Sequence, residues 1–227
     1  MAAAARVIAT QGLSAPTAVI AREAGVSNGS LFTYFETKAD LFSQLYLELK
    51  TGMAVASLEG LAVQAPLREQ LSRLWSNWMR WAMSNPGKRR ALAQLDVSDD
   101  ITQESRAASH QAMTEVAGVL ERARADGPMR DTPMAFVVAI MNSLAEATMD
   151  FMISDPANAD EHSRAGFDAL CRMLGCLFFS MRAWCRLGTG QGVHHHRPDV
   201  GHRLPDGSRA GEARHGHPGG PRPGKAR

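Results

Sequence analysis

The sequence predicts an all-α protein, and three observations support that fold class. No segment of the 227 residues alternates apolar and polar side chains in the way that is typical of a β-strand. Apolar residues recur instead at intervals of three and four, which is the spacing of one helix face. Residues that start and stop helices, such as Gly12, Pro16 and Asp155-Pro156, bracket these segments at ordinary helix lengths.

Three short helices are expected at the N-terminus. The first, Ala2–Gln11, is followed by Gly12, a residue type that suits the position just after a helix. The second, Pro16–Ala24, starts with a proline, which is tolerated in a first turn. Ser27 is placed to cap the N-terminus of the third, Asn28–Phe35.

Longer helices are expected after residue 36. Thr37 begins the fourth helix, with Asp40 three positions later in the manner of a capping box, and this helix runs to about Leu61. Proline and glycine clusters then separate the later segments. The remaining expected helices are about Leu67–Ser84, Lys88–Val97, Thr102–Ala125, Pro133–Ile153 and Asp160–Cys185.

The second and third helices have the spacing of a helix-turn-helix. With Thr17 as the first position, Ala21 lies where the two helices approach most closely, and Gly25 lies at the turn. Leu31 then makes the buried contact of the second helix, so that the two helices can cross at a steep angle. A helix held in this way projects from the surface and can enter a DNA major groove. The pattern therefore predicts a DNA-binding protein.

The stretch IAREAGVSNGSLFTYFETKADLF, residues 20–42, closely resembles the N-terminal signature of the TetR-like bacterial transcriptional regulators. The resemblance covers about residues 3–46. It implies a helix-turn-helix DNA-binding domain over residues 1–46 and a helical ligand-binding and dimerisation domain over residues 47–186. It also implies a cytoplasmic homodimer that represses transcription and is released from operator DNA by a small apolar ligand.

One side of the third helix is expected to contact DNA. Leu31 and Phe35 lie one turn apart and should face the core, which leaves Asn28 and Gly29 on the other side. The amide of Asn28 can make contacts to base edges, and glycine lets the helix backbone come close to the duplex. The alternative is that the polar residues only solvate a helix face. The predicted DNA-binding residues are Thr17, Ser27, Asn28, Gly29, Ser30, Phe32, Thr33, Tyr34 and Lys38.

Within this set, the residue types divide between bases and phosphates. Phe32 and the methyl group of Thr33 can pack on thymine methyl groups. Phe32 departs from the family, in which tyrosine is commoner at this position, and the departure removes a hydroxyl contact. By resemblance, the phosphate-binding residues would be Thr17, Ser30, Tyr34 and Lys38.

The N-terminal region carries no net positive charge, which is unusual for a region that binds DNA strongly. Residues 1–50 contain four Lys/Arg and four Asp/Glu, although a DNA-binding surface must neutralise phosphates. Family members usually carry an Arg/Lys-rich segment before the first helix. Here Met1 falls where that helix begins, so we expect a missing basic arm, through a misassigned start or a truncation. The alternative function is a helical dimeric protein-interaction module with a weakened DNA-binding head.

Tryptophan and methionine residues predict where a ligand binds. Family members bind small molecules between helices of the C-terminal domain, so an apolar and adaptable cavity is expected. The predicted lining residues are Trp75, Trp78, Met79, Met141 and Met149. Ordinary core packing is the alternative. Glu146 or Asp150, on an otherwise apolar helix, could orient a cationic or hydroxylated ligand.

The last predicted helix carries an apolar seam at heptad spacing. Its residues, at intervals of three and four, are Phe167, Leu170, Leu174, Leu177, Met181 and Trp184. The preceding helix is apolar nearly all round. Two such helices predict a four-helix homodimer interface, with a purely intramolecular core as the alternative.

The sequence offers little support for other functional classes. It has no glycine-rich phosphate loop, no nucleophile elbow and no zinc-binding histidine pair outside its C-terminal tail, so we expect no enzyme activity, cofactor or metal. No run approaches the roughly 18 apolar residues of a membrane span, and no membrane association is expected.

The final segment, residues 187–227, is expected to be disordered. Residues 186–227 hold ten of the twenty glycines, five of the eleven prolines and six of the eight histidines, with no aromatic residue. A segment of this composition cannot bury enough apolar surface to offset its loss of conformational entropy. Its alternative role is a basic tail that adds non-specific affinity for DNA.

Overall fold

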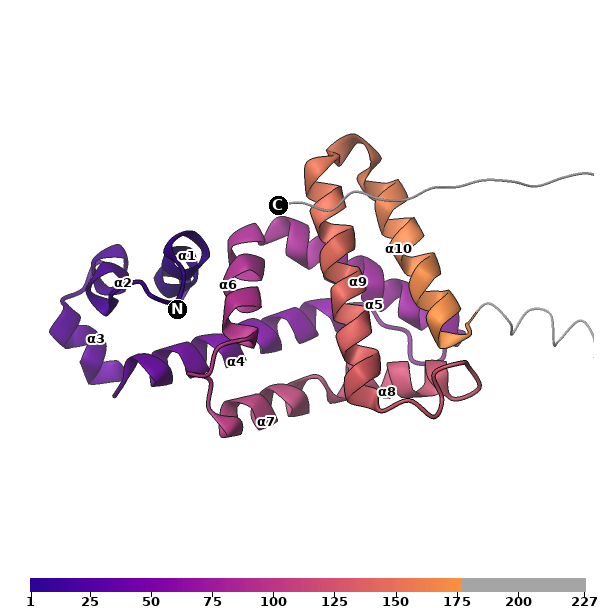
Figure 1. Cartoon of the computed structure of the whole chain (residues 1–227), viewed down its shortest axis with the longest axis horizontal. Helices are drawn as coiled ribbons and strands as arrows, with labels where there is room; N and C mark the ends of the chain where they lie inside the picture. Colours follow the sequence, from indigo (N-terminus) through magenta and orange to yellow (C-terminus); the bar gives the residue numbers. More distant parts are fainter. Residues whose placement is uncertain (177–227) are drawn as a thin grey trace, which may run out of the picture. The chain divides into compact units, whose positions relative to one another are not determined.

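A computed structural model describes residues 1–176 of the chain. This part contains ten α-helices, one 3-10 turn and no strand, which confirms the all-α fold class (Figure 1). The elements are α1 (Ala2–Gln11), α2 (Thr17–Glu23), α3 (Asn28–Tyr34), α4 (Lys38–Leu58), α5 (Leu67–Ser84), α6 (Pro86–Asp96), α7 (Gln103–Ala112), α8 (Thr114–Arg124), α9 (Met134–Ser154), η1 (Pro156–Asn158) and α10 (Ala159–Leu174). The expected tail of residues 187–227 lies outside the described residues.

Local sequence signals start several of these helices as expected. The side chain of Ser27 accepts a hydrogen bond from the backbone N–H of Ser30 at the start of α3. Thr37 accepts one from the N–H of Asp40 at the start of α4, and the carboxylate of Asp40 accepts from the N–H of Glu36. These side-chain oxygens satisfy backbone donors that have no partner inside the helix.

Helices α7 and α8 replace the single helix expected over Thr102–Ala125. The break is at Met113, whose N–H donates to the carbonyl oxygens of both Ser109 (3.2 Å) and His110 (3.1 Å). Its side chain packs against both apolar cores of the protein. No proline or glycine marks this position, so tertiary packing rather than a local signal sets the break.

Helix α10 ends at Leu174, not at Cys185 as expected. Gly175 adopts a left-handed conformation with φ of 86°, and the N–H groups of Gly175 and Cys176 both donate to the carbonyl oxygen of Cys171. The loop after α8 packs directly on this helix end. A Cβ atom at Gly127 would overlap the carbonyl group of Leu174, so the close approach requires glycine there.

The apolar side chains form two cores. The first joins α1–α4 with α6, and it includes Ile8, Phe42 and Leu95. The second joins α5, α8, α9 and α10, and it includes Met79 and Leu174. Helix α6 is therefore packed into the core of the N-terminal helices although it follows them by about thirty residues. The boundary at residue 46 between two domains stays a prediction.

Helix α9 has a high mean hydropathy. It is the one helix in the described part that is long and apolar enough to span a membrane, and a third of its most apolar window is buried. The prediction that no segment approaches the length of a membrane span was therefore wrong for α9. Helix α10 packs along α9 and presents exposed Asp160, Glu161 and Arg164, which hydrocarbon would not accommodate.

Candidate DNA-binding surface and ligand cavity

Helices α2 and α3 form a helix-turn-helix. Gly25, with φ of 73°, turns the chain after α2, and the N–H of Val26 donates to the carbonyl oxygen of Ala21. Leu31 is buried in the first core and anchors α3 on the N-terminal helices. The four helices of this region are seen together in Figure 1. The anchoring side of α3 is thus the one that the sequence predicted.

The other side of α3 faces solvent. Phe32 is 43% exposed and Tyr34 is 77% exposed. These two side chains are two positions apart on α3 and therefore point to different sides of the exposed part of the helix. The structure brings six of the nine predicted DNA-binding residues together on this exposed side and the helix start, namely Asn28, Gly29, Ser30, Phe32, Thr33 and Tyr34; Ser27 caps the same helix and is also exposed.

Hydroxyl groups on α3 already take part in local hydrogen bonds. The Oγ atoms of Ser27 and Ser30 lie 2.8 Å apart, and one donates to the other. Thr33 donates from Oγ1 to the carbonyl oxygen of Gly29 at 3.3 Å. A hydroxyl group can both donate and accept, so each of these side chains keeps capacity for a further partner.

Two predicted phosphate-binding residues lie away from the exposed face of α3. Thr17 is half-buried at the first position of α2. Lys38, at the start of α4, donates from Nζ to the carbonyl oxygen of Leu13 at 2.6 Å, and its ammonium group lies 5.2 Å from the ring centroid of Phe42. Lys38 therefore ties the loop between α1 and α2 to α4, and two of its three N–H donors remain for another acceptor.

Charges of the N-terminal helices largely compensate one another. Arg6 binds Glu23 at 2.8 Å, and Lys50 binds Asp96 at 2.9 Å. Within residues 1–176, Arg22 takes part in no ion pair, and it lies at the exposed end of α2. Within residues 1–50, the balanced charge is thus reflected in the pair Arg6–Glu23, while Lys50 is neutralised from outside this region by Asp96 of α6.

A cavity of about 620 Å³ lies among α4, α5, α7, α8 and α9. This volume is within the usual range of small-molecule sites. Its walls are mostly apolar, and they are formed by Tyr46, Lys50, Met53, Ser57, Leu71, Leu74, Trp75, Trp78, Asp96, Arg106, Ser109, His110, Met113, Val116, Ala117, Leu120, Met134, Ala135, Val138, Met141, Asn142 and Leu170.

The cavity contains part of the predicted ligand set. Trp75, Trp78 and Met141 line it, and the two tryptophan rings meet edge to face with centroids 6.2 Å apart. Trp75 is fixed further, because its Nε1 donates to the carbonyl oxygen of Ser163. Met79 and Met149 do not line the cavity; both are fully buried in the second core, as the alternative of ordinary packing foresaw.

The acidic residues proposed to orient a ligand lie elsewhere. Glu146 and Asp150 are not in the cavity wall, and they bind Arg89 of α6 at 3.0 Å and 2.5 Å. Burial of Glu146 raises the pKa of its carboxyl group, and the positive charge of Arg89 opposes that rise. These three residues link α6 to α9 instead.

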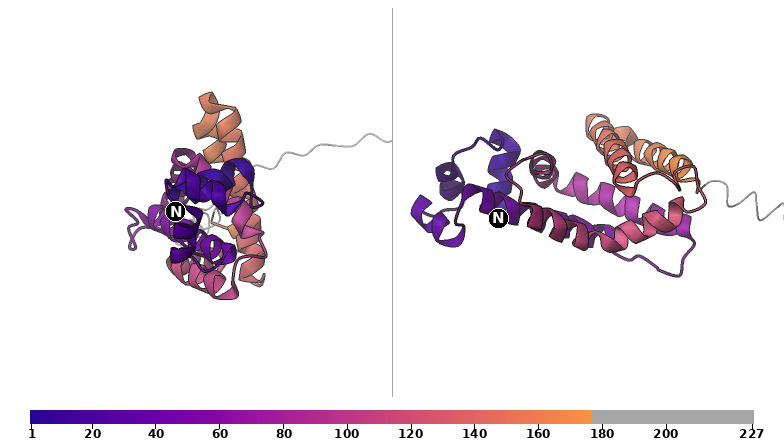
Figure 2. Two further views of the ribbon diagram at one scale, coloured as in Figure 1. Left: turned by 90° about the vertical axis from the view of Figure 1, so that its left-hand side faces the viewer. Right: turned by 60° about the horizontal axis from the view of Figure 1, so that its bottom comes forward.

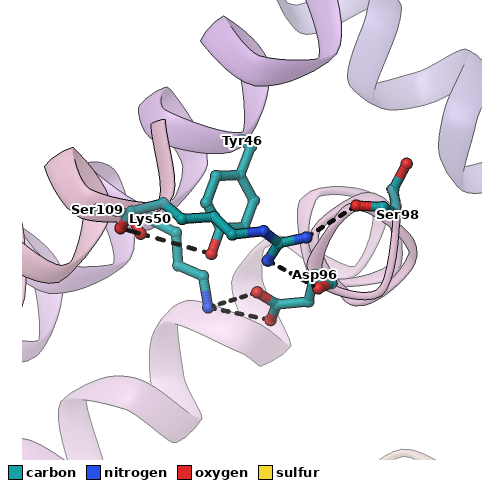
Figure 3. A network of polar contacts seen from close by, with 6 residues as sticks. Tyr46, Lys50, Asp96, Ser98 and Ser109 are labelled. Carbon is teal, nitrogen blue, oxygen red and sulfur yellow. Dashed lines mark hydrogen bonds and ion pairs between the residues drawn. The ribbon is translucent and has the colours of Figure 1, made fainter. Parts of the chain in front are cut away.

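One end of the cavity is polar, which the sequence did not lead us to expect (Figure 3). Lys50 of α4 binds the carboxylate of Asp96, at the end of α6. Arg106 of α7 donates to the carbonyl oxygens of Asp96 (3.1 Å) and Ser98 (2.8 Å). The ring of Tyr46 lies close to both cations. The sequence feature that could have indicated this end is the pair Tyr46 and Lys50, which are one turn apart on the mostly apolar inner side of α4.

Three residues of the predicted dimer seam face inward. Phe167, Leu170 and Leu174 are buried in the second core of the same protomer, so they offer no surface to a partner and match the alternative of an intramolecular core. Leu177, Met181 and Trp184 lie outside the described residues. The outward side of α9 is apolar instead: Phe136 is 57% exposed and Phe151 is 62% exposed.

Comparisons with known proteins agree with the geometry of the N-terminal helices. The family model of bacterial regulatory proteins of the tetR family matches residues 1–45, which contain the whole helix-turn-helix. Residues 1–45 of the chain are therefore TetR-like. The matched residues contain α2 and α3, and in a helix-turn-helix the second helix is the one that can enter a DNA major groove.

Solved structures similar to the TetR-like chain extend beyond its N-terminal helices. A tetR family transcription regulator from Shewanella sp. PV-4 is 27% identical with a TM-score of 0.67, covering 75% of this chain and 92% of that one. One from Marinobacter aquaeolei VT8 is 21% identical with a TM-score of 0.65, covering 75% and 90%. FadR from Bacillus subtilis, solved in complex with stearoyl-CoA, is 17% identical with a TM-score of 0.57, covering 75% and 95%. The latter two show the fold alone.

Proposed function

We propose that this TetR-like chain is a cytoplasmic, homodimeric transcriptional repressor that binds operator DNA and is released by a small ligand. The observation that carries the proposal is the exposure of α3: Leu31 anchors the helix, while Asn28, Phe32, Thr33 and Tyr34 face solvent. Amide and hydroxyl groups suit base edges and phosphates, and aromatic and methyl groups suit thymine. The match of residues 1–45 to the tetR family model supports this assignment.

The proposed dimer forms through the outward side of α9 together with α10. Between the exposed Phe136 and Phe151, this side of α9 carries the small exposed residues Ala139, Ser143 and Ala147. Two copies related by a two-fold axis would bury these side chains in a four-helix arrangement. A dimer would place two recognition helices about 34–36 Å apart, which is the spacing of successive major grooves.

The contacts of α6 offer a route from the cavity to the DNA-binding helices. Asp96 ends α6 and lines the cavity, while Leu92 and Leu95 of the same helix pack in the core of α1–α4. The chain after α6 also reaches α4, because the N–H of Thr102 donates to Oγ of Ser43. Ligand that shifts α6 or α7 would therefore move groups packed on the DNA-binding helices, and DNA and ligand would oppose one another through a coupling free energy.

The test uses DNA selected from a random duplex library by the full chain. We expect enrichment of a palindromic site, and Asn28→Ala should lower the preference for that site over random duplex by about 1–3 kcal/mol. Lys38→Ala should weaken binding to all duplexes alike. Gln111→Ala, an exposed amide on α7, is the matched control and should change neither quantity. The assignment is supported if the wild-type chain prefers the selected site over random duplex and Asn28→Ala has lost that preference. It is contradicted if Asn28→Ala prefers the selected site as strongly as the wild type does.

A second candidate function is the helical dimeric interaction module with a weakened DNA-binding head. The compensated charges favour it, since Arg6 and Lys50 are paired with carboxylates and Lys38 is bound to a carbonyl group. Salt dependence separates the two functions. A DNA-binding head loses affinity steeply as salt concentration rises because phosphate counterions are released on binding. A flat response, with weak binding at all salt concentrations, would favour the interaction module.

A further inference from the structure

The charged residues of the cavity lie at one end of it. Lys50, Asp96 and Arg106 come from α4, α6 and α7, which contact one another next to the DNA-binding helices. Helices α5, α8 and α9 supply mostly apolar side chains, such as Leu74 and Val116, with Asn142 of α9 as a polar exception. Helix α4 runs alongside α7 and α8 (Figures 1 and 2). The charged residues and the apolar residues of the cavity therefore follow one another along these helices. A ligand that fills the cavity meets apolar walls along its body and charge at one end.

The charges at this end do not balance. Lys50 Nζ lies 2.9 Å from Oδ1 and 3.0 Å from Oδ2 of Asp96, which pairs one cation with one anion. Arg106 donates to backbone carbonyl oxygens and belongs to no ion pair among residues 1–176. The carboxylates of Glu146 and Asp150 are bound to Arg89, off the cavity wall. Among the Lys, Arg, Asp and Glu side chains of the wall, two cations, Lys50 and Arg106, therefore face one carboxylate, Asp96.

The two cations are held in fixed positions. The ring centroid of Tyr46 lies 5.4 Å from Lys50 Nζ and 5.8 Å from Arg106 Cζ, so both cations are within reach of a cation–π contact with this ring. Figure 3 shows Tyr46 and Lys50 in this cluster. The Tyr46 hydroxyl group lies 3.4 Å from Oγ of Ser109. The side chain of Lys50 is only 14% exposed. A cation largely removed from water gains most from an anion that hydrogen-bonds to it.

We propose that the cavity binds an aliphatic monocarboxylate. Its carboxylate would accept hydrogen bonds from the free N–H donors of Lys50 and Arg106, and its chain would lie along the walls of α5, α8 and α9. One negative charge brings the wall to neutrality. An alcohol leaves the excess charge uncompensated, and an amine adds a like charge beside two cations. The inference rests on the proposed function, because it names the ligand class of the same regulatory cavity.

The probes are decanoate, decan-1-ol and decylamine, which share one chain length and differ in the charge of the head group. Binding to the full chain is measured by calorimetry and by the melting temperature, without DNA. We expect decanoate to bind at least about tenfold more tightly than decan-1-ol, and decylamine to bind most weakly. Equal binding of acid and alcohol, or tighter binding of the amine, would overturn the proposal.

Variants locate the carboxylate. Lys50→Gln and Arg106→Gln should each lower the affinity for decanoate about tenfold or more while leaving that for decan-1-ol unchanged, and Lys50→Arg should retain most of the affinity. The melting temperature of each ligand-free variant reports whether it folds. If Lys50→Gln does not fold, the head-group position is tested with Arg106→Gln and Lys50→Arg instead. Unchanged decanoate affinity in folded Gln variants would contradict the proposed head-group position.

A separate assay with operator DNA keeps the two proposals apart. If decanoate binds with the expected pattern but leaves the DNA complex intact, the ligand class stands and ligand-controlled release is wrong. If decan-1-ol or decylamine releases DNA and decanoate does not, ligand-controlled release stands and the monocarboxylate is wrong.

Discussion

Gln94 of α6 donates a hydrogen bond of 3.1 Å from Nε2 to the carbonyl oxygen of Ile8 in α1. Its Oε1 atom also lies close to Gly12, at the end of α1. The same helix ends at Asp96, in the wall of the cavity. One short helix thus reaches from the cavity wall to α1.

Gln94→Ala should weaken the coupling between ligand and DNA. We expect a loss of about 0.5–1.5 kcal/mol in the free energy of unfolding, the usual net value of one hydrogen bond. Operator affinity without ligand should change little, because Gln94 lies outside α3, whereas the concentration of ligand needed to release DNA should rise. Titration of the DNA complex with ligand measures this, with Gln111→Ala as control. Identical release curves for Gln94→Ala and wild type would remove α6 from the proposed route.

Gly127→Ala should destabilise the protein through the end of α10. The added methyl group would overlap the carbonyl group of Leu174, and overpacking of this kind typically costs about 1–3 kcal/mol. Gly52→Ala is the matched control, since Gly52 lies inside α4 with open space around it and alanine favours helix by about 0.5–1 kcal/mol. The free energy of unfolding of both variants is measured by urea denaturation. Similar stability of the two would mean that the α8–α9 loop does not rest on α10.

Ala147→Glu should disrupt the proposed dimer. Ala147 lies on the outward side of α9 between the exposed phenylalanines, and a two-fold axis there would bring two carboxylates into an apolar interface. We expect the dissociation constant measured by sedimentation equilibrium to rise by at least a hundredfold, with operator affinity falling as well. Ala107→Glu places the same charge on the exposed side of α7 and should leave the dimer intact. A dimer unaffected by Ala147→Glu would assign the interface to another surface.

The pKa of Glu146, raised mainly by burial, predicts how stability depends on pH. A carboxyl group whose folded pKa exceeds its unfolded value binds more protons in the folded state. Its stabilising contribution is full below the unfolded pKa and is lost as pH rises through the folded pKa. Glu146→Gln lacks this titration, so the stability of the variant relative to wild type should improve as pH rises from about 4 toward neutrality. Urea unfolding across this range measures the difference; a constant difference would contradict the burial effect.

Elements with local signals were predictable from the sequence. Ser27 and Thr37 cap helices as expected, and Gly25 turns the chain between α2 and α3. The inward side of α3 was also foreseen, because Leu31 is the aliphatic residue at the buried position of the motif. In each case the chemistry that decides the structure lies within a few residues of the position concerned.

Features that depend on distant contacts were not predictable. The break at Met113 has no breaker residue, and the end of α10 depends on the approach of Gly127 to Gly175. Heptad spacing gave the buried side of α10, but it does not say whether that side meets the same chain or a partner. The polar end of the cavity combines Lys50 with Arg106, which are far apart in sequence and meet only in the folded chain.

Photo-crosslinking from α3 to the selected operator tests the central claim most directly. Phe32 is replaced by p-benzoylphenylalanine in the full chain, with the same replacement at Val97, an exposed residue beyond the end of α6, as control. The account predicts crosslinks from position 32 to major-groove bases in both half-sites and none from position 97. A DNA complex that forms without crosslinks from position 32, or with equal crosslinking from position 97, would contradict it.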